Sequence, residues 1–182
     1  MGIQSTKAIL SKPQLGTCTN YSACAKLVYE IKLLSVRLNE ALKQLDPDAH
    51  KSHKDLSEKI KLDYPHARAR ASIDPILFQG RSVIFNRQTP NHVDKKDPKL
   101  GWNPLTTAGD YTGGCLRIRR LKLRMWYGPG CCVFLRGAIL PHEVEEFEGG
   151  QRISIAHFCH ESLWKEVGVK LCSSGLECLK NM

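Results

Sequence analysis

Residues 115–158, CLRIRRLKLRMWYGPGCCVFLRGAILPHEVEEFEGGQRISIAHF, decide the fold class. Short apolar runs alternate here with turn signals, among them Gly128-Pro129-Gly130 and Gly149-Gly150. Glycine and proline interrupt regular structure, and many short strands at near-regular spacing are typical of a β-sandwich or barrel. The runs expected to form strands are residues 76–78, 83–85, 105–108, 115–119, 122–127, 131–136, 142–146 and 152–158.

The chain upstream of these strands has a helical pattern. Apolar residues recur every three or four positions from Ser22 to Gln44, which predicts an amphipathic helix ending at Asp46-Pro47. A weaker helix is expected over His50–Leu62, with Leu56, Ile60 and Leu62 on its apolar side and Pro65 as its stop. The heptads are not sustained, so we expect helices that cover a sheet rather than a coiled coil. The predicted fold class is α+β.

Composition and charge narrow the possible functions. The chain has 182 residues, 42% of them hydrophobic, which suits one domain with a sizeable core and excludes wholesale disorder. No apolar run approaches the roughly 20 residues that span a bilayer, and we expect no membrane association. The formal net charge of +9 suggests a polyanionic partner. Residues 1–90 carry 14 basic and 8 acidic side chains, so most of this excess lies outside the strand-rich half.

The eight cysteines contain no CxxC pair, which disfavours a zinc ribbon or finger. A disulfide scaffold is also disfavoured, because the chain is long and has no secretory signal. Four of the cysteines fall inside apolar strand-like runs, and we interpret them as small core residues of an intracellular protein. These four are Cys115, Cys131, Cys132 and Cys159.

One constellation in the strand-rich half indicates chemistry. His92 and Asp94 form an H-x-D tripeptide, and in a strand their side chains would share one face. A second histidine, His142, starts a later expected strand. Two histidines and one carboxylate are the ligand set of non-haem Fe(II) oxygenases. Arg152 and Ser154 follow at the same i, i+2 spacing, and arginine offers a planar fork for a carboxylate.

The order of these residues resembles the 2-oxoglutarate- and Fe(II)-dependent oxygenase superfamily. More narrowly, the segments FNRQTPNHVDKKDPKLGW (85–102), GDYTGG (109–114), LRMWYGPGCCVFLRGAILPHEV (123–144) and GGQRISIAHFCHESLWKE (149–166) resemble the fungal TET/JBP-like oxygenase domains. The resemblance falls within residues 76–167, about half of the chain.

This resemblance implies a double-stranded β-helix (jelly-roll) core at residues 76–167, with residues 1–75 as covering helices and residues 168–182 as a tail. His92, Asp94 and His142 would bind Fe(II). Arg152 would pair with the far carboxylate of 2-oxoglutarate, and Ser154 would add a hydrogen bond. O2 is the second cosubstrate.

Other polar residues compete for roles in this site. His157 and His160 lie in or just after the last strand, but either could replace His142 only by breaking the His-then-Arg order. Strand parity turns His157 away from the Arg152 face, which favours a core position. Asn86, Arg87 and Trp102 are candidate substrate contacts, weighed against a polar strand end for the first two and ordinary packing for Trp102.

A basic stripe follows on the next strands. Its charges alternate with leucines and isoleucine, and the alternation slips at Arg119-Arg120, which indicates a bulge or tight turn. The stripe suits either phosphate binding or an ordinary solvated sheet face. A neighbouring acidic run argues against a simple nucleic-acid groove. The stripe comprises Arg117, Arg119, Arg120, Lys122 and Arg124, and the acidic run Glu143, Glu145, Glu146 and Glu148.

The expected activity is therefore Fe(II)/2-oxoglutarate-dependent dioxygenation. By resemblance, the substrate is the methyl group of a 5-methylpyrimidine, 5-methylcytosine first, in DNA or RNA. The alternatives are hydroxylation of a protein side chain or small molecule, and a catalytically silent relic of the fold. We expect an intracellular location, in the nucleus if the substrate is DNA.

Overall fold

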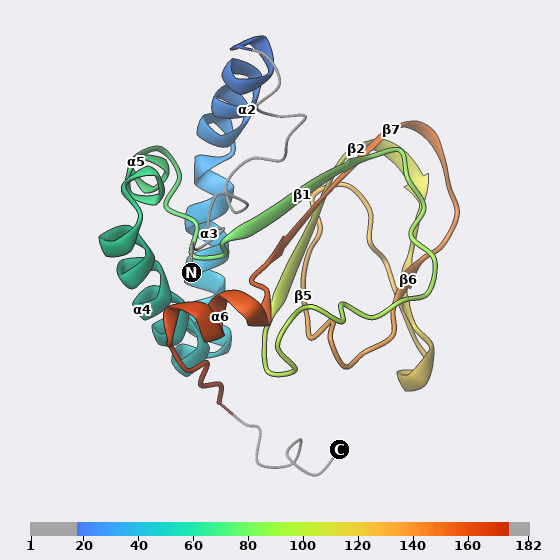
Figure 1. The fold of residues 1–182 in the computed structure, drawn as a ribbon. Coiled ribbons are helices and arrows are strands. Elements are labelled where there is room, and N and C mark those ends of the chain that lie inside the picture. Colours follow the sequence, from blue (N-terminus) through green and yellow to red (C-terminus); the bar gives the residue numbers. More distant parts are fainter. Residues whose placement is uncertain (1–17, 175–182) are drawn as a thin grey trace. The chain divides into compact units, whose positions relative to one another are not determined.

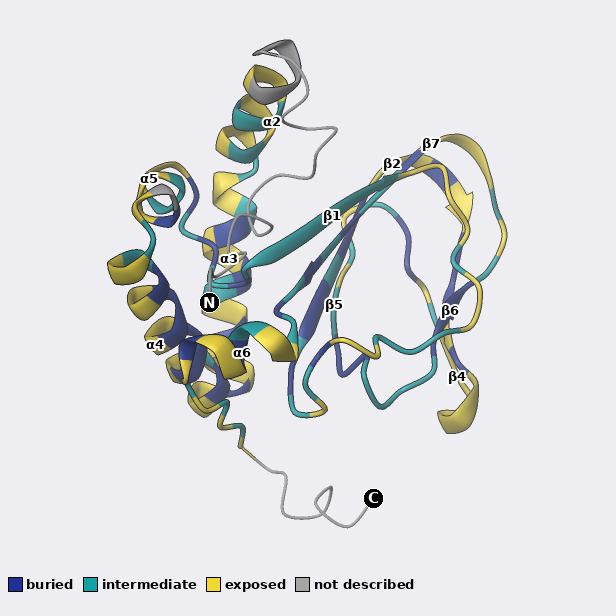
Figure 2. Ribbon diagram, in the orientation of Figure 1, coloured by how far each residue is buried: buried dark blue, intermediate teal, exposed yellow. Residues whose placement is uncertain are grey.

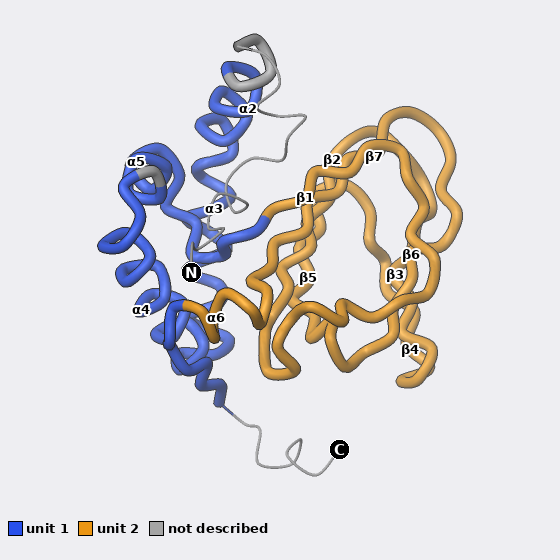
Figure 3. The backbone as a smooth tube through the Cα atoms, viewed as in Figure 1, with its two compact units in different colours: residues 1–80, 167–175 blue, residues 81–166, 176–182 orange. Residues whose placement is uncertain are grey.

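The computed structural model describes residues 18–174, so the first part of the predicted helical segment and the end of the predicted tail lie outside the described residues. The described chain forms two compact units (Figure 3). One comprises residues 18–80 and 167–174, and the other residues 81–166. Within residues 18–174, no helix is long and apolar enough to cross a membrane.

The first unit consists mainly of helices (Figure 1). The single helix predicted over residues 22–44 is divided at Ile31, whose ψ of 12° departs from the helical value. The prediction of one continuous helix was therefore wrong in this detail. The helices are α2 (Cys18–Glu30), α3 (Lys32–Leu45), α4 (Pro47–Asp63) and α5 (Pro65–Ile73).

Pro47 and Pro65 each begin a helix in this unit. Asp46 caps α4 by accepting a 3.0 Å hydrogen bond from the Ala49 amide, and Pro47 takes the first helical position, where no N–H is needed. The helix therefore starts three residues before the predicted His50. Pro65 begins α5 in the same way, so the expected stop is also the start of a helix that the sequence pattern did not reveal.

The apolar stripes of α3 and α4 supply most of the core of the helical unit. Residues 76–78 were predicted as a strand but have no strand pairing, and Ile76 and Phe78 pack as buried side chains instead. The Phe78 ring lies 4.7 Å from that of His53, centroid to centroid. Leu62, predicted as an apolar position of α4, is 75% exposed. The buried core includes Leu38, Leu42, Leu56, Ile60, Ile76 and Phe78.

The second unit contains two sheets with the orders β1-β7-β2-β5 and β4-β3-β6. Strand β2 pairs antiparallel with β5 and β7, and β3 pairs antiparallel with β4 and β6. The strands are β1 (Gly80–Phe85), β2 (Asn103–Gly113), β3 (Leu116–Ile118), β4 (Leu123–Met125), β5 (Cys132–Leu135), β6 (Glu143–Val144) and β7 (Phe147–Phe158). A short helix, α6 (Glu161–Val167), follows β7.

An apolar cluster joins the two sheets. Leu116 and Val144 from the three-stranded sheet are buried with Tyr127, and Leu105 and Val133 from the four-stranded sheet pack against them. The sheets therefore share one core, and antiparallel packing of this kind leaves the outer faces polar. Residues 119–124, which lead from β3 into β4, are in contrast exposed (yellow in Figure 2).

The phase slip at Arg119-Arg120 is a tight turn, as predicted. A 3₁₀ turn, η2 (Arg119–Leu121), joins β3 to β4, and Lys122 follows it with a left-handed φ of 52°.

The cysteines agree only partly with their assignment to the core. Cys115 and Cys159 are buried, Cys131 is half-buried, and Cys132 is exposed on β5, which corrects the assignment for that residue. These four cysteines, together with Cys24 and Cys172, are not joined in disulfides.

Candidate metal centre and the buried Arg152

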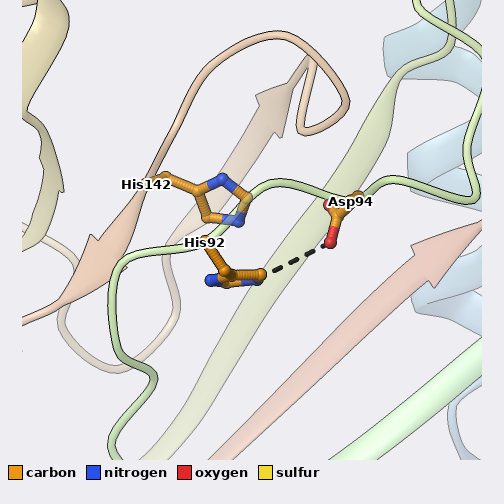
Figure 4. A group of neighbouring side chains, drawn as sticks. All are labelled: His92, Asp94 and His142. Carbon is orange, nitrogen blue, oxygen red and sulfur yellow. Dashed lines mark ion pairs between the residues drawn. The ribbon is translucent and has the colours of Figure 1, made fainter.

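His92, Asp94 and His142 lie together, with one potential ligand atom from each within 4.8 Å of the others (Figure 4). The expected local structure was wrong, because the H-x-D tripeptide is not part of a strand. His92 instead forms a single antiparallel bridge with His142, in which each amide donates a 3.0 Å hydrogen bond to the other's carbonyl. This bridge brings the two imidazole rings to a centroid separation of 4.3 Å.

Backbone carbonyls orient both histidine rings. The Nδ1 atoms of His92 and His142 lie 2.9 Å from the carbonyl oxygens of Pro90 and Leu140. A carbonyl can only accept, so each Nδ1 carries a proton, and in the neutral ring each Nε2 keeps its lone pair. Burial lowers the pKa of His142, which favours the neutral ring that binds metal ions. The Nε2 atoms of His92 and His142 are therefore oriented as potential metal ligands.

Asp94 completes the cluster from a loop. Its Oδ1 lies 3.6 Å from Nε2 of His92 (dashed in Figure 4), and its amide donates a 2.9 Å hydrogen bond to the Gly137 carbonyl. Gly137 lies against the Asp94 carboxylate so closely that a Cβ there would collide with Oδ2. The carboxylate therefore depends on a residue without a side chain after β5.

Arg152 is buried in an unusual environment. It is 1% exposed, its Nε and Nη2 have no hydrogen-bond partner, and it forms no ion pair with any described residue. The guanidinium carbon lies 5.2–5.5 Å from the ring centres of Tyr111, Tyr127 and Phe147. Burial raises the pKa of Tyr127, so this phenol stays neutral and offers Arg152 no counter-charge.

A buried guanidinium with free donors is costly, because such groups are normally paired. A carboxylate is the partner that its planar fork fits best. The free donors of Arg152 therefore fit a carboxylate, and the cluster of His92, Asp94 and His142 fits a divalent metal ion.

Ser154 and Asn86 lie near Arg152 along the chain or the sheet. Ser154 has the same strand parity as Arg152 in β7 and is half-buried. Asn86 has a left-handed φ of 47° and two hydrogen bonds to the Arg152 backbone. Its backbone N–H donates to the Arg152 carbonyl (2.8 Å), and its side-chain Oδ1 accepts from the Arg152 backbone N–H (2.7 Å). The Asn86 side chain thus ties the end of β1 to β7, and its contact with substrate stays a prediction.

The two rival histidines lie outside the metal cluster. His157 is fully buried; its Nε2 accepts a 3.0 Å hydrogen bond from Arg81 Nε, and its Nδ1 lies 3.3 Å from the Pro104 carbonyl. This is the expected core position. His160 contacts Asp97 instead, with 2.7 Å between Nδ1 and Oδ1.

The aromatic and basic substrate candidates differ in their surroundings. The Trp102 ring lies 4.1 Å from the Arg136 guanidinium carbon, a cation–π contact that agrees with the packing role. Arg87 is exposed.

Much of the basic stripe is paired with the acidic run. Arg119 donates two hydrogen bonds, of 2.8 and 3.0 Å, to the carboxylate of Glu143, and this pairing lowers the pKa of Glu143. Arg124 and Arg117 lie 2.9 and 3.7 Å from Glu145. Three of the five charges of the stripe are therefore paired with carboxylates, which reduces the positive charge available for phosphate.

A groove of about 430 Å³ lies beside this paired surface. Residues 88–90, which lead to His92, form part of its wall. The groove's charged side chains are Arg117, Arg119, Glu143, Glu145 and Glu146. The acidic groups outnumber the basic ones, so the groove itself does not select for phosphate.

Three parts of this region could not be recognised in the sequence: the aromatic rings around Arg152, the role of Gly137, and the contact of Asp97 with His160. Tyr111 and Tyr127 both lie near Arg152 but are separated along the chain. The only signal near Tyr127 was the turn Gly128-Pro129-Gly130, which does not indicate a contact with Arg152. Gly137 was treated as a turn signal alone, although the space it leaves for Asp94 is its structural role.

Comparisons with known proteins bear on these observations. The Tet_JBP family model, the oxygenase domain of the 2OGFeDO superfamily, matches residues 8–161. No curated protein matches the chain. A solved structure of NgTET1 in complex with 5mC DNA is similar at 20% sequence identity and a TM-score of 0.45, over 50% of this chain and 37% of that one. The chain thus spans less than two thirds of that protein.

Proposed function

Because the chain belongs to the Tet/JBP family of the 2OGFeDO superfamily, we propose that it is an Fe(II)- and 2-oxoglutarate-dependent dioxygenase. We propose further that it oxidises the methyl group of 5-methylpyrimidines, 5-methylcytosine first, in DNA or RNA. The observation that carries the proposed enzyme class is the buried, unpaired Arg152 in the same unit as the cluster of His92, Asp94 and His142.

The roles of this chain's residues follow from their contacts. His92 and His142 would present Nε2 to the metal, because their Nδ1 protons are held by backbone carbonyls. Asp94 would add one carboxylate oxygen and neutralise part of the metal's charge. Three protein ligands leave further positions for cosubstrates. When bound, Fe(II) and 2-oxoglutarate supply the activation of O2, with 2-oxoglutarate oxidised to succinate and CO2 as the substrate carbon is hydroxylated.

Arg152 would bind the far carboxylate of 2-oxoglutarate through its free nitrogens. Ser154 would add a hydrogen bond from the same strand face. The rings of Tyr111, Tyr127 and Phe147 exclude water from the guanidinium, which strengthens its attraction for a carboxylate. Neutral aromatic walls also keep any competing anion of the protein itself away from Arg152.

We propose the organisation that the sequence suggests, a jelly-roll core preceded by a helical segment and followed by a tail at residues 168–182, with one change at the first boundary. The jelly-roll core would begin at residue 81 rather than residue 76, because residues 76–80 belong to the helical unit. Two antiparallel sheets that share one apolar cluster support the jelly-roll assignment. If DNA is the substrate, the protein would act in the nucleus.

The direct test is mass analysis of nucleosides after incubation of the protein with methylated DNA, Fe(II), 2-oxoglutarate and O2. We expect oxidised 5-methylcytosine and stoichiometric succinate. His92→Ala and Asp94→Ala should abolish both products. His50→Ala, which changes a histidine of α4, is the matched control and should keep them.

The outcomes separate the levels of the proposal. Succinate release with a protein or small-molecule substrate, but none with methylated nucleic acid, would contradict the substrate and retain the enzyme class. A folded wild-type protein that binds no iron and releases no succinate would overturn the enzyme class.

Arg152 provides a second, independent test. Arg152→Met keeps an apolar side chain but removes the guanidinium that would bind the carboxylate. The 2-oxoglutarate concentration for half-maximal succinate release should therefore rise by about two orders of magnitude. Metal binding in the absence of 2-oxoglutarate should not change. An unchanged 2-oxoglutarate requirement would place the anchor elsewhere.

A further inference from the structure

The loop that follows Asp94 contains a buried carboxylate with two side-chain partners. Asp97 is 7% exposed, and its two oxygens accept from different parts of the chain. Oδ2 accepts a 2.5 Å hydrogen bond from Nδ2 of Asn103, at the start of β2. Oδ1 accepts a 2.7 Å hydrogen bond from Nδ1 of His160, which lies between β7 and α6. Asp97 therefore joins three distant segments.

These contacts belong to a closed ring of hydrogen bonds that includes Asp94. The Asp97 amide donates to the Asp94 carbonyl at 3.0 Å, and the Asp94 amide donates to the Gly137 carbonyl at 2.9 Å. The Gly137 amide donates to Asn103 Oδ1 at 3.2 Å, and Asn103 donates in turn to Asp97. Both backbone polar groups of Asp94 thus take part in the ring.

His160 fastens this ring to the end of the four-stranded sheet. Its ring stacks on that of Phe158, the last residue of β7, with a centroid distance of 4.7 Å and an interplanar angle of 27°. The next amide, of Glu161, donates a 2.8 Å hydrogen bond to the Lys96 carbonyl. The loop after Asp94 is consequently held at two neighbouring points by the segment after β7.

We propose that Asp97, Asn103 and His160 are positioning residues that hold Asp94 in the geometry required for metal binding. This inference rests on the proposed role of Asp94 as a metal ligand. His92 and His142 fix each other through their backbone bridge, but Asp94 lies in a loop and lacks such a partner strand. A metal site loses affinity when one of its ligands lies on a mobile loop, because ordering the loop consumes part of the binding free energy. Hydrogen bonds that fix the loop beforehand avoid this loss.

The test measures Mn(II) binding to metal-free protein by electron paramagnetic resonance, without 2-oxoglutarate or turnover. Asn103→Ala opens the ring at two bonds and should weaken Mn(II) binding roughly 10–100-fold. His160→Ala removes one donor and should weaken it less. His160→Asn places an amide donor near the position of Nδ1 and should restore binding, a rescue that a role in metal ligation through Nε2 would not produce.

Thr107→Ala is the matched control for a structural effect. Thr107 lies on the same strand as Asn103, is equally buried, and donates a 2.6 Å hydrogen bond to the Gly128 carbonyl outside the ring. Melting temperatures of both variants measure their loss of stability. Asn103→Ala should lose far more Mn(II) affinity than Thr107→Ala for a comparable decrease in melting temperature.

The outcomes distinguish this inference from the proposed function. If wild-type protein binds Mn(II), His92→Ala does not, and Asn103→Ala binds as well as Thr107→Ala, the positioning role is overturned and the metal site stands. If wild-type protein binds no Mn(II), or His92→Ala binds as tightly as wild type, both the metal site and the positioning role are overturned.

Discussion

A single methyl group at Gly137 should disable the metal centre. Gly137 needs no left-handed backbone conformation; its requirement is for space. An added Cβ would collide with Oδ2 of Asp94, lie 3.0 Å from its Cγ, and lie 3.2 Å from Oδ1 of Asn103. The substitution Gly137→Ala therefore pushes against a proposed ligand and against the residue that holds its loop.

The size of the effect follows from this crowding. Ordinary carbon contacts lie near 3.5–4.0 Å, so the Asp94 carboxylate must move by about 1 Å, whereas metal–ligand distances tolerate roughly 0.2 Å. We expect Gly137→Ala to weaken Mn(II) binding by at least 10–100-fold, the range typical for disturbed partners of metal ligands. Overpacking in a buried position should also lower the free energy of unfolding by about 1–3 kcal/mol.

Mn(II) titration followed by electron paramagnetic resonance measures the first quantity, and urea unfolding the second. Gly150→Ala is a matched control, because its Cβ would collide with the carboxylate of Asp110, an exposed aspartate outside the metal cluster. The control should bind Mn(II) as wild type does. A folded Gly137→Ala protein with wild-type Mn(II) affinity would refute the reasoning, since Asp94 would then be free to move without consequence.

Three further predictions concern other parts of the chain. Burial lowers the pKa of His53 to about 4, so below pH 6.5 the unfolded chain binds a proton that the folded chain does not. The free energy of unfolding should therefore decrease by up to roughly 3 kcal/mol between pH 6.5 and 4. Urea unfolding of His53→Phe should lack this part of the decrease in stability with falling pH. Asp46→Ala removes the α4 cap and the bond from the Ser174 amide, and should cost about 1–2 kcal/mol in the same assay, with faster amide exchange at Ser174. If the protein binds nucleic acid through the hairpin, Arg120→Gln with Lys122→Gln should reduce the slope of log affinity against log salt by roughly 2, whereas an unchanged slope would place the phosphates elsewhere.

The chemistry of the site could be predicted from residue types and their order, because ligand atoms are properties of single residues. His92, Asp94, His142 and Arg152 were all chosen from the sequence, and the structure brings the first three together. The local reason was nevertheless wrong: alternation in a strand was expected, whereas a one-residue bridge and a loop achieve the same grouping. Proximity in space does not require the secondary structure that a short spacing suggests.

Helix boundaries show a similar division. Apolar periodicity located α3 and α4, but Pro65 was interpreted only as a stop, because its place at the start of α5 depends on the residues after it. Residues 76–78 have the composition of a strand, yet they complete the core around α3 and α4. Burial of apolar side chains selects their final position, and several elements can satisfy it.

The amino-acid sequence by itself determined the α+β class, the order of helices before strands, and the residue types available for metal and carboxylate binding. The tertiary structure decided which of these residues have partners. It paired Arg119 with Glu143, left the buried nitrogens of Arg152 free, and placed Gly137 against Asp94. These outcomes depend on distances between segments far apart in the chain, and on burial, which sets the strength of each charge interaction. No pattern along the sequence carries that information.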